Sequence, residues 1–276
     1  MNRSVPPALR PQAVLRVESA TWLNAHLVRI VAGGADFSLL SPNNATDKYV
    51  KLYFARPDLA LTAPYDLKAL ADVLPAADVP VRRTYTVRWM DPAAQRLAID
   101  FVVHGDDGVA GPWAARARPG DALVVSGPNG SWRPDPTADW YLFAGDEAAL
   151  PAIAAGLEVL PGHSTGHVFL EVAQASDAVE LSAPAGVVVH WVVRGEREAG
   201  STRLLADAVS ALDWPAGRVE AFVHGERGAM KALRDVLFTS RGLERSQVSL
   251  SGYWAHGRSE GRFQAEKREP IGQILP

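Results

Sequence analysis

Residues 100–114 have the sequence DFVVHGDDGVAGPWA, which decides how the first half of the chain is interpreted. An apolar run ends at His104, a glycine-rich turn follows, and the small residues Ala110 and Gly111 open an alanine-rich stretch. This order predicts a strand, a turn and the start of a helix, where backbone N–H groups and the positive end of the helix dipole face one point. A phosphate fits such a point, although glycines in a strand-to-helix turn can also serve the backbone alone.

Outward from this stretch, residues 12–127 hold short runs rich in Val, Leu, Ile, Tyr and Phe, separated by Gly, Pro, Asn and Asp. Such runs predict six strands, at 13–17, 26–31, 49–55, 83–89, 97–104 and 122–126. Six short strands with turns between them favour a small antiparallel β-barrel. A helix is expected at 109–118, and the long connection 57–80 is expected to be partly helical and at the surface.

The pattern changes after the Pro- and Asp-rich stretch 133–139, because strands and helices then alternate. Alternation predicts a parallel sheet covered by helices. The predicted strands are 140–144, 167–173, 187–193, 218–224 and 248–251, and the predicted helices are 147–160, 202–212 and 228–238. With 276 residues the chain is long enough for two domains, which we expect at 1–132, the barrel, and at 133–276, the α/β domain with a polar C-terminal tail.

The composition narrows the classes of function. Apolar residues make up 47% of the chain and the formal net charge is -3, so nothing draws the whole chain to nucleic acid or anionic lipid. Cysteine is absent, which excludes disulfides and thiolate-ligated metals, and the seven histidines show no helix-spaced ligand pair, so no metal site is expected. Residues 1–11 lack the apolar core of a leader peptide, and no run approaches the roughly 20 apolar residues of a membrane span. We therefore expect a cytoplasmic monomer without a membrane or nucleic-acid partner.

The strand predicted at 83–89 begins with Arg83-Thr84-Tyr85-Thr86. In a strand Arg83 and Tyr85 project to one face and Thr86 to the other. A guanidinium binds a pyrophosphate through two parallel hydrogen bonds, and an aromatic ring packs on a flat ring system. With the threonine hydroxyl, these groups indicate a flavin dinucleotide, while a basic and aromatic strand start also occurs in barrels without a ligand.

Two short motifs follow strands of the predicted parallel sheet. Gly145-Asp146-Glu147 comes after the first strand, and Gly225-Glu226 comes after the fourth. Nucleotides bind at the carboxyl edge of open α/β sheets, so these residues indicate a nicotinamide dinucleotide site. A glycine turn with Asp146 as an ordinary helix N-cap would produce the same pattern.

In order and spacing, the motifs of this chain resemble the siderophore-interacting protein family, which comprises FAD-dependent ferric-siderophore reductases of the ferredoxin–NADP reductase-like superfamily. The resemblance rests on Arg-x-Tyr-Thr at 83–86, Asp-Phe-Val-Val-His-Gly at 100–105, Gly-Val-Ala-Gly-Pro-Trp-Ala at 108–114, Pro-Gly-Asp at 119–121, Gly-Pro-Asn-Gly at 127–130, Ala-Gly-Asp-Glu-Ala-Ala-Leu-Pro-Ala-Ile at 144–153, His-Gly-Glu at 224–226, and Gly-Tyr-Trp at 252–254. These motifs span most of the chain.

The resemblance implies two groups of cofactor-binding residues. FAD would be held by Arg83, Tyr85, Thr86, Asp100, Val102, His104, Gly108, Ala110, Gly111 and Trp113. NADPH, or NADH in its place, would be held by Gly145, Asp146, Glu147, Gly225 and Glu226. Candidate partners for the 2′-phosphate of NADPH are Arg194, Arg197 and Arg227.

Three positions depart from the family pattern. Family members usually have proline at 109 and serine or threonine at 111, so Val109 and Gly111 imply that a hydroxyl contact to phosphate is lost. His224 replaces a family alanine, which implies a changed approach for the nicotinamide.

The implied activity is electron transfer from NAD(P)H through FAD to the ferric iron of a siderophore, whose hard oxygen ligands hold Fe(II) less tightly than Fe(III). The transfer is centred on the flavin, so no protein acid or base is required. Because ferric siderophores are typically anionic, cations are expected near the flavin. Lys51 matches a family lysine on a barrel strand, and Lys48, Arg245 and Arg258 are further candidates, although each arginine would also be ordinary as a solvated surface charge.

Alternatives to this activity stay open. The donor could be a ferredoxin instead of a nicotinamide. The acceptor could be a ferredoxin, a quinone or an oxygenase partner, and a siderophore-binding protein without catalysis would keep the same scaffold.

Overall fold

The computed structural model describes residues 11–41, 43–106 and 108–275, and the chain divides into two compact units. Among the described residues, the first unit contains 11–22, Leu27–Asn44 and Lys48–Gly130, and the second contains Leu23–His26, Ala45–Asp47 and 131–275. Residues 1–10, where no leader peptide is expected, lie outside the described residues.

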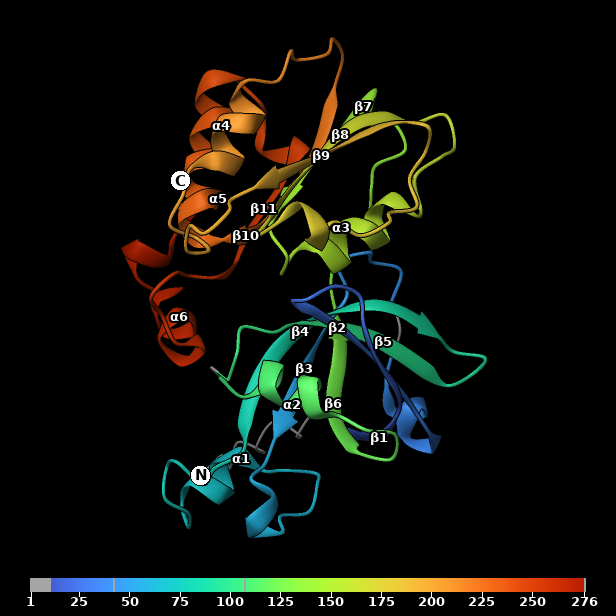
Figure 1. Ribbon diagram of the computed structural model, residues 1–276, viewed down its shortest axis with the longest axis vertical. Coiled ribbons are helices and arrows are strands. Elements are labelled where there is room, and N and C mark those ends of the chain that lie inside the picture. Colours follow the sequence, from blue (N-terminus) through green and yellow to red (C-terminus); the bar gives the residue numbers. More distant parts are fainter. Residues whose placement is uncertain (1–10, 42, 107, 276) are drawn as a thin grey trace, which may run out of the picture. The chain divides into compact units, whose positions relative to one another are not determined.

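The first unit is a closed barrel in which every neighbouring pair of strands is antiparallel, in the order β1-β2-β5-β4-β3-β6 (Figure 1). The strands are β1 (Ala13–Trp22), β2 (Leu27–Gly33), β3 (Tyr49–Phe54), β4 (Val81–Asp91), β5 (Arg96–Val102) and β6 (Ala122–Asn129). The predicted antiparallel barrel is therefore confirmed. Closure pairs β1 with β6, so that neither terminal strand is left as an open edge.

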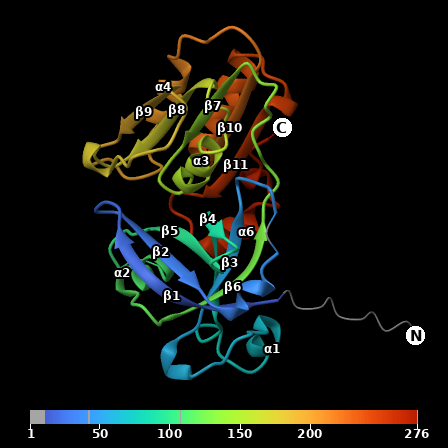
Figure 2. The ribbon, with the colours of Figure 1, turned by 90° about the vertical axis from the view of Figure 1, so that its right-hand side faces the viewer.

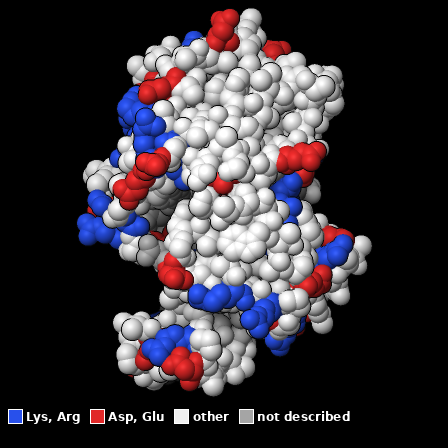
Figure 3. Space-filling model, in the orientation of Figure 1, with Lys and Arg blue, Asp and Glu red and all other residues white. Residues whose placement is uncertain are grey.

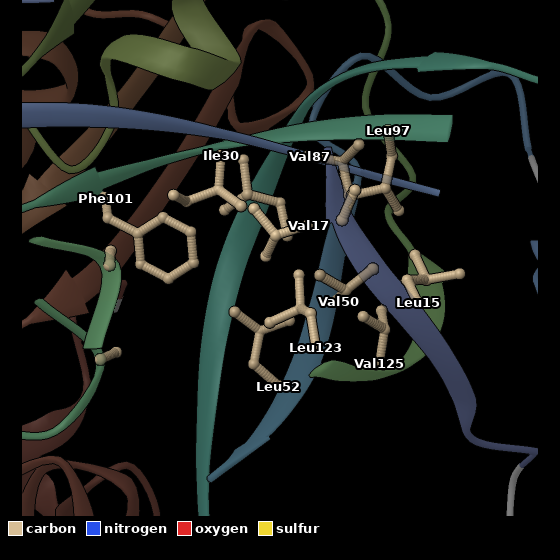
Figure 4. Packing of buried hydrophobic residues seen from close by; sticks show 14 of the residues in the cluster. Leu15, Val17, Ile30, Val50, Leu52, Val87, Leu97, Phe101, Leu123 and Val125 are labelled. Carbon is tan, nitrogen blue, oxygen red and sulfur yellow. The ribbon is translucent and has the colours of Figure 1, made fainter. Parts of the chain in front are cut away.

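The barrel core follows from the period-2 pattern of its strands. In β3 the alternate residues Val50, Leu52 and Phe54 are buried, whereas the residues between them are half-buried. Figure 4 shows how Val50 and Leu52 point toward side chains from the other strands, among them Ile30 and Leu123. Burial of these apolar side chains is the main driving force for closing the barrel.

Two helices accompany the barrel strands. Helix α1 (Leu67–Ala71) lies in the long connection before β4, where Asp66 caps it by accepting from the N–H groups of Lys68 and Ala69. Helix α2 (Ala110–Arg116) follows β5 and packs on the core through Ala110 and Ala114. Both agree with the sequence, which predicts a helix near 109–118 and a partly helical connection.

The second unit is a five-stranded parallel sheet in the order β11-β10-β7-β8-β9, with β9 at one edge (Figure 2). Its strands are β7 (Trp140–Gly145), β8 (Thr165–Val172), β9 (Gly186–Val193), β10 (Val219–Glu226) and β11 (Val248–Trp254). The chain builds outward from β7 to β9 and then returns to the other side of β7. The strand order thus reverses between β7 and β10, which is where ligands bind in open α/β folds.

Helices cover both faces of this sheet. They are α3 (Leu150–Leu157), α4 (Leu204–Ser210) and α5 (Arg227–Arg234), the last continued by a π-helical turn over Asp235–Ser240. Leu142 of β7 belongs to one cluster with Leu205 of α4 and Leu233 of α5. The neighbouring Phe143 points to the opposite face, where a Cβ on Gly156 of α3 would lie 2.9 Å from its ring. The predicted α/β domain is confirmed.

Two details differ from the predictions. Helix α3 starts at Leu150 and not at 147, because Asp146 first forms a turn in which its carboxylate accepts from the N–H of Ala148. The polar tail contains a helix that the sequence pattern does not predict, α6 (Glu260–Glu266), capped by the hydroxyl of Ser259. No helix within the described ranges has the length and apolar character needed to cross a bilayer.

Candidate functional site

The first candidate site lies on β4. Arg83 pairs with Leu52 and Tyr85 with Val50, so both side chains project to the same face of the strand, as alternation predicts. Arg83 is half-buried, and its Nη1 donates to the carbonyl oxygen of Arg82 at 3.1 Å. Thr86 projects to the other face and is buried.

Tyr85 of this strand belongs to a cluster of aromatic rings that also come from β3, β5 and α2. Tyr85 packs on Phe101 of β5 with ring centroids 4.5 Å apart, and Phe101 packs on Trp113 of α2 at 5.7 Å. Phe54 of β3 meets Trp113 edge-on at 5.5 Å. Each pair of rings contributes beyond its buried area, so this cluster holds the side chain of Tyr85 in a defined place.

The connection from β5 to α2 supplies the glycine turn that the sequence predicts. Gly105 and Gly108 have φ values of 56° and 80°, where other residues are strained, and an added Cβ at either would have open space around it. His104 is exposed, and α2 begins directly after the turn with Ala110. Gly111 serves packing, since a Cβ there would lie 3.0 Å from the carbonyl oxygen of Val102.

Asp100 has a different environment from the one the sequence suggests. Its carboxylate is buried and accepts two hydrogen bonds from Arg29 of β2, both 2.7 Å long. The pair joins β2 to β5, so Asp100 stabilises the barrel two residues before the half-buried Val102.

The two barrel lysines lie near the start of β3, with Lys48 directly before the strand and Lys51 within it. Nζ of Lys51 donates to the hydroxyl of Thr84 on β4 at 2.5 Å and lies 5.4 Å from the ring centre of Tyr49. Lys48 is half-buried, and its carbonyl oxygen accepts from the N–H of Val87. Both lysines are therefore held by contacts with β4.

The second candidate site lies at the carboxyl edge of the parallel sheet, between β7 and β10. Gly145 is needed for close packing, because a Cβ there would lie 2.6 Å from the carbonyl oxygen of His224 and 2.6 Å from Cβ of Ala149. A Cβ on Gly225, whose φ is 153°, would lie 2.9 Å from the carboxylate of Asp146. The predicted residues of the two motifs thus meet at the point where the strand order reverses.

Asp146 holds three strand ends together. Its Oδ2 accepts from the backbone N–H of Glu226 at 2.8 Å and from the indole N–H of Trp254 at 2.8 Å, while Oδ1 accepts from the N–H groups of Ala148 and Ala149. Burial, with a smaller effect from Glu147, raises the pKa of Asp146 to about 7, although these donors favour the ionised form.

The other two carboxylates at this edge are also engaged. Glu226 caps α5 by accepting from Ala229 N–H and accepts a second hydrogen bond from His256 N–H. Glu147 is 2.6 Å from Nη1 of Arg194. A pocket at this edge is lined by Asp146, Glu147, Glu171, Glu226, Gly200, Thr202, Leu205 and Trp254, together with Ala199 and Ala229.

Family models match both units of the chain. Residues 16–132 match a model described as the siderophore-interacting FAD-binding domain, and residues 138–257 match a model described as siderophore-interacting protein. The chain belongs to the siderophore-interacting protein family. The resemblance seen in the sequence is confirmed.

Similar proteins cover almost the whole length of this family member. A protein of Mycobacterium tuberculosis (strain ATCC 25618 / H37Rv) without an assigned function is 44% identical over 272 residues, which are 94% of this chain and 96% of the relative. The ferric vibriobactin reductase ViuB of Vibrio cholerae serotype O1 is 33% identical over 251 residues, 89% and 90% of the two chains. The chain is therefore related to an oxidoreductase that acts on a siderophore complex.

Solved structures agree with this assignment. A siderophore utilization protein from T. fusca has a TM-score of 0.79 at 37% identity and covers 90% of this chain and 94% of its own. The ferredoxin reductase of carbazole 1,9a-dioxygenase shares the fold alone, with a TM-score of 0.63 at 17% identity over 90% of this chain and 71% of its own. The two-domain, ferredoxin reductase-like fold class is confirmed.

In this siderophore-interacting protein the two C-terminal arginines do not form one cluster. Arg245 lies before the first residue of β11 and Arg258 lies after its last, so the seven-residue strand separates them. Arg258 instead joins Arg227 and Arg262 around the carboxylate of Glu266, with donor distances of 2.8, 2.6 and 2.8 Å. Arg245 and Arg258 are therefore not neighbours, and the role of each in binding a siderophore stays a prediction.

His224, the residue at the family's alanine position, is buried and bonded to β11. Its ring is buried, stacks on Phe222 with centroids 3.8 Å apart, and makes hydrogen bonds with the hydroxyls of Tyr253 and Ser249. Burial lowers the pKa of His224 to about 3, so the ring is neutral at physiological pH. Its ring packs between β10 and β11, and an effect on the approach of a nicotinamide stays a prediction.

Two acidic residues have roles that are not among the predictions from the sequence. Glu171, next to the last residue of β8, lines the pocket at the carboxyl edge. An acidic residue some twenty positions after the glycine turn of the first strand is a known signal in nucleotide-binding folds and would have identified it. Hydrogen bonds from three arginines, Arg227 foremost, lower the pKa of Glu266 to about 2. The pattern of the polar tail gives no signal for these contacts.

Proposed function

We propose that this protein is a FAD-dependent ferric-siderophore reductase that takes electrons from a nicotinamide dinucleotide. The observation that carries the proposal is the arrangement on β4, where Arg83 and Tyr85 share one face beside a ring cluster and the glycine turn, within the part of the chain that matches a FAD-binding domain. The 33% identity to ferric vibriobactin reductase supports the choice of acceptor.

The barrel residues fit FAD by their chemistry. Arg83 has an exposed portion and no carboxylate partner among the described residues, so its guanidinium is free to bind the pyrophosphate. Tyr85 is fixed by Phe101 and would support the ribityl chain or the flavin ring, and Thr86 would donate to a ring atom. The turn at Gly105 and Gly108 leaves space for phosphate beside the start of α2.

Bound FAD would supply the step from a two-electron donor to a one-electron acceptor. The protein residues would bind and orient the partners. Lys51 and Lys48 would attract an anionic ferric siderophore, and Arg258, whose side chain is 30% exposed, would add positive charge on the second unit. Arg245 lies at the other end of β11 from Arg258 and stays a separate candidate on the second unit.

FAD binding tests the first part of the proposal. Arg83→Ala should weaken FAD binding by roughly ten-fold to a hundred-fold, because a charge-assisted, bidentate contact is lost. Arg82→Ala is the matched control, since Arg82 is the exposed neighbour on the same strand. Flavin absorbance after gel filtration and quenching of flavin fluorescence on titration measure both. Equal FAD affinity in the two variants would contradict the placement on β4.

Anaerobic spectroscopy tests the electron path. NADH or NADPH should bleach the flavin, and ferric siderophores should restore its colour while a ferrous chelator traps the product. Lys51→Ala should slow reoxidation by an anionic ferric siderophore with little change in the rate of bleaching. Failure of every ferric siderophore to reoxidise the flavin would rule out the proposed acceptor.

A further inference from the structure

The α/β unit begins with a long stretch that carries no positive side chain. Between Arg133 and Arg194 the sequence has no Lys or Arg, but it has eight carboxylates, Asp135, Asp139, Asp146, Glu147, Glu158, Glu171, Asp177 and Glu180. Figure 3 shows the result as a broad area without Lys or Arg where Figure 1 draws β7, β8 and β9. A nucleotide bound at the ends of β7 and β8 would therefore meet mainly carboxylates, with Arg194 beside Glu147 as a cation at that edge.

Glu171 lies in that surface at a defined place. It comes just before the end of β8, the strand next to β7, and 26 positions after Gly145 (171 minus 145). In nucleotide-binding folds an acidic residue at this place accepts a hydrogen bond from the 2′-hydroxyl of the adenosine ribose, whereas an arginine nearby accommodates a 2′-phosphate. The chain has the acidic residue.

The carboxylate of Glu171 is built into the pocket and still has an unused oxygen. The residue is 6% exposed, and its Oε2 accepts from the hydroxyl of Thr202 at 3.4 Å. No donor among the described residues bonds to Oε1, and this oxygen is not among the atoms sealed from solvent. It is therefore available to a ligand hydroxyl.

Two of the three arginines that could bind a 2′-phosphate are bonded to carboxylates, whereas Arg197 is exposed and donates to the carbonyl oxygen of Arg194 at 3.1 Å. The side chain of Arg194 is 7% exposed and bonded to Glu147 at 2.6 Å. The side chain of Arg227 is 9% exposed and bonded to Glu266 at 2.6 Å. Releasing Arg194 would leave the half-buried Glu147 without this partner, which is costly. Releasing Arg227 would leave its own nearly buried guanidinium without a carboxylate, although Glu266 would keep Arg258 and Arg262.

From these observations we propose that the electron donor is NADH and that Glu171 selects it over NADPH, by accepting a hydrogen bond from the free 2′-hydroxyl and repelling a 2′-phosphate. The inference rests on the proposed nicotinamide site. It goes beyond the resemblance to the family, which implies NADPH or NADH in its place. The charge of Glu226 at the same edge acts in the same direction as Glu171, whereas the charge of Glu147 is offset by Arg194.

Binding of two nucleotide fragments to the FAD-loaded protein tests the inference without relying on turnover. By calorimetry, ADP-ribose should bind at least about ten-fold more tightly than 2′-phospho-ADP-ribose. Glu171→Gln keeps the size of the side chain and removes its charge, so this ratio should fall by about ten-fold, chiefly through tighter binding of the phosphorylated fragment. Glu171→Asp should retain the preference, because the charge remains.

Controls separate selection from structural damage. Glu180→Gln removes an exposed carboxylate of the same unit and should leave the ratio unchanged. Urea unfolding of Glu171→Gln checks that the fold is intact. Anaerobic bleaching by NADH and NADPH should follow the binding ratio, with the change in KM and not in the limiting rate.

Three results would overturn the inference. These are equal or tighter binding of 2′-phospho-ADP-ribose by the unmodified protein, an unchanged ratio in Glu171→Gln, and a changed ratio in Glu180→Gln of the same size. If neither fragment binds, the nicotinamide donor itself is wrong and the inference fails with it. In that case reoxidation of chemically reduced FAD by ferric siderophore would still show the reductase activity, so the two failures are distinguishable.

Discussion

The flavin strand of the barrel and the carboxyl edge of the parallel sheet use their polar residues in opposite ways. On β4, Arg83 is bonded to the carbonyl oxygen of its neighbour, and the glycine turn after β5 has open space around it. Between β7 and β10, Asp146 and Glu226 are buried and bonded to the backbone of other elements. The donors of the first region are available to a ligand, whereas the carboxylates of the second hold strand ends together.

This difference has a consequence for substitutions. A side chain kept for a ligand should affect binding with little effect on folding, and a side chain bonded within the protein should affect folding first. The four predictions below test this distinction, from the largest expected effect to the smallest.

Gly145→Ala should have the largest effect. The new Cβ would lie 2.6 Å from a backbone carbonyl that cannot move freely, so we expect a loss of about 3 kcal/mol in the free energy of unfolding. Gly162→Ala is the control, since an added Cβ there meets nothing within 4 Å. Urea unfolding monitored by tryptophan fluorescence measures both. A loss in Gly145→Ala no larger than in the control would contradict the tight packing of β7 against β10.

Asp146→Ala should destabilise the FAD-free protein by about 2 to 3 kcal/mol, because buried N–H groups of Glu226 and Trp254 lose their acceptor. Arg83→Ala should change the same quantity by less than about 0.5 kcal/mol, as expected for a partly exposed side chain. Chemical denaturation of FAD-free samples compares them. Similar losses in the two variants would remove the distinction between the regions.

The pH dependence of stability should reveal two opposing buried groups. The unfolded chain protonates His224 below pH 6.5 while the native pKa is about 3, so this residue lowers stability as the pH falls from 6.5 toward 3. The native pKa of Asp146 is about 7 against 3.8 in the unfolded chain, so this residue raises stability as the pH falls from 7 toward 4. Over the shared range each contributes about 1.4 kcal/mol per pH unit, with opposite sign.

His224→Gln should therefore expose the effect of Asp146 alone. Relative to the unmodified protein, the variant should gain about 2 kcal/mol of stability between pH 6.5 and about pH 5. Urea unfolding across this range measures the difference, and Asp146→Ala should show the reverse trend. A variant that follows the pH profile of the unmodified protein would contradict the assignment of a neutral, buried His224.

Gly111→Ser should affect folding less than Gly145→Ala or Asp146→Ala. Its Cβ would lie 3.0 Å from the carbonyl oxygen of Val102, which a small shift of α2 can relieve at a cost of about 1 kcal/mol. The new hydroxyl restores the family's usual residue type and should strengthen FAD binding by a few-fold, since one hydrogen bond to phosphate is added. Ala115→Ser on the same helix is the control for FAD affinity. Fluorescence titration with FAD measures the affinity of both variants. An unchanged FAD affinity in Gly111→Ser would contradict the placement of α2 beside the phosphate.

The local pattern of the sequence predicts much of this fold. In β3, alternation of Val50, Leu52 and Phe54 with polar or aromatic residues is enough to predict a strand with one buried face. Alternation of strands and helices after residue 139 predicts the parallel sheet in the same way. The closing pair of β1 with β6 joins residues more than a hundred positions apart, for example Ala13 with Val125, and no local pattern shows this.

The candidate sites were predictable to a smaller extent, because their chemistry depends on distant partners. The sequence places Asp100 beside the glycine turn, but its partner Arg29 is 71 positions away. Glu147 lies 47 positions before Arg194, and the bond between them removes a candidate for the 2′-phosphate. The Asp146 motif predicts a helix cap and a nucleotide edge equally well. In the structure Asp146 closes a turn before α3, whose N-cap is Ala149, and it also bonds to Glu226 and Trp254.

The arginines around Glu266 determine where the chain can be shortened. The family match ends at residue 257, which would be a natural place to cut the protein for expression or crystallisation. A chain cut there would lack Glu266 and leave the guanidinium of Arg227, whose side chain is 9% exposed, without its carboxylate at the start of α5. The boundary of the recognisable family sequence is thus not the boundary of the folding unit, which extends at least through α6.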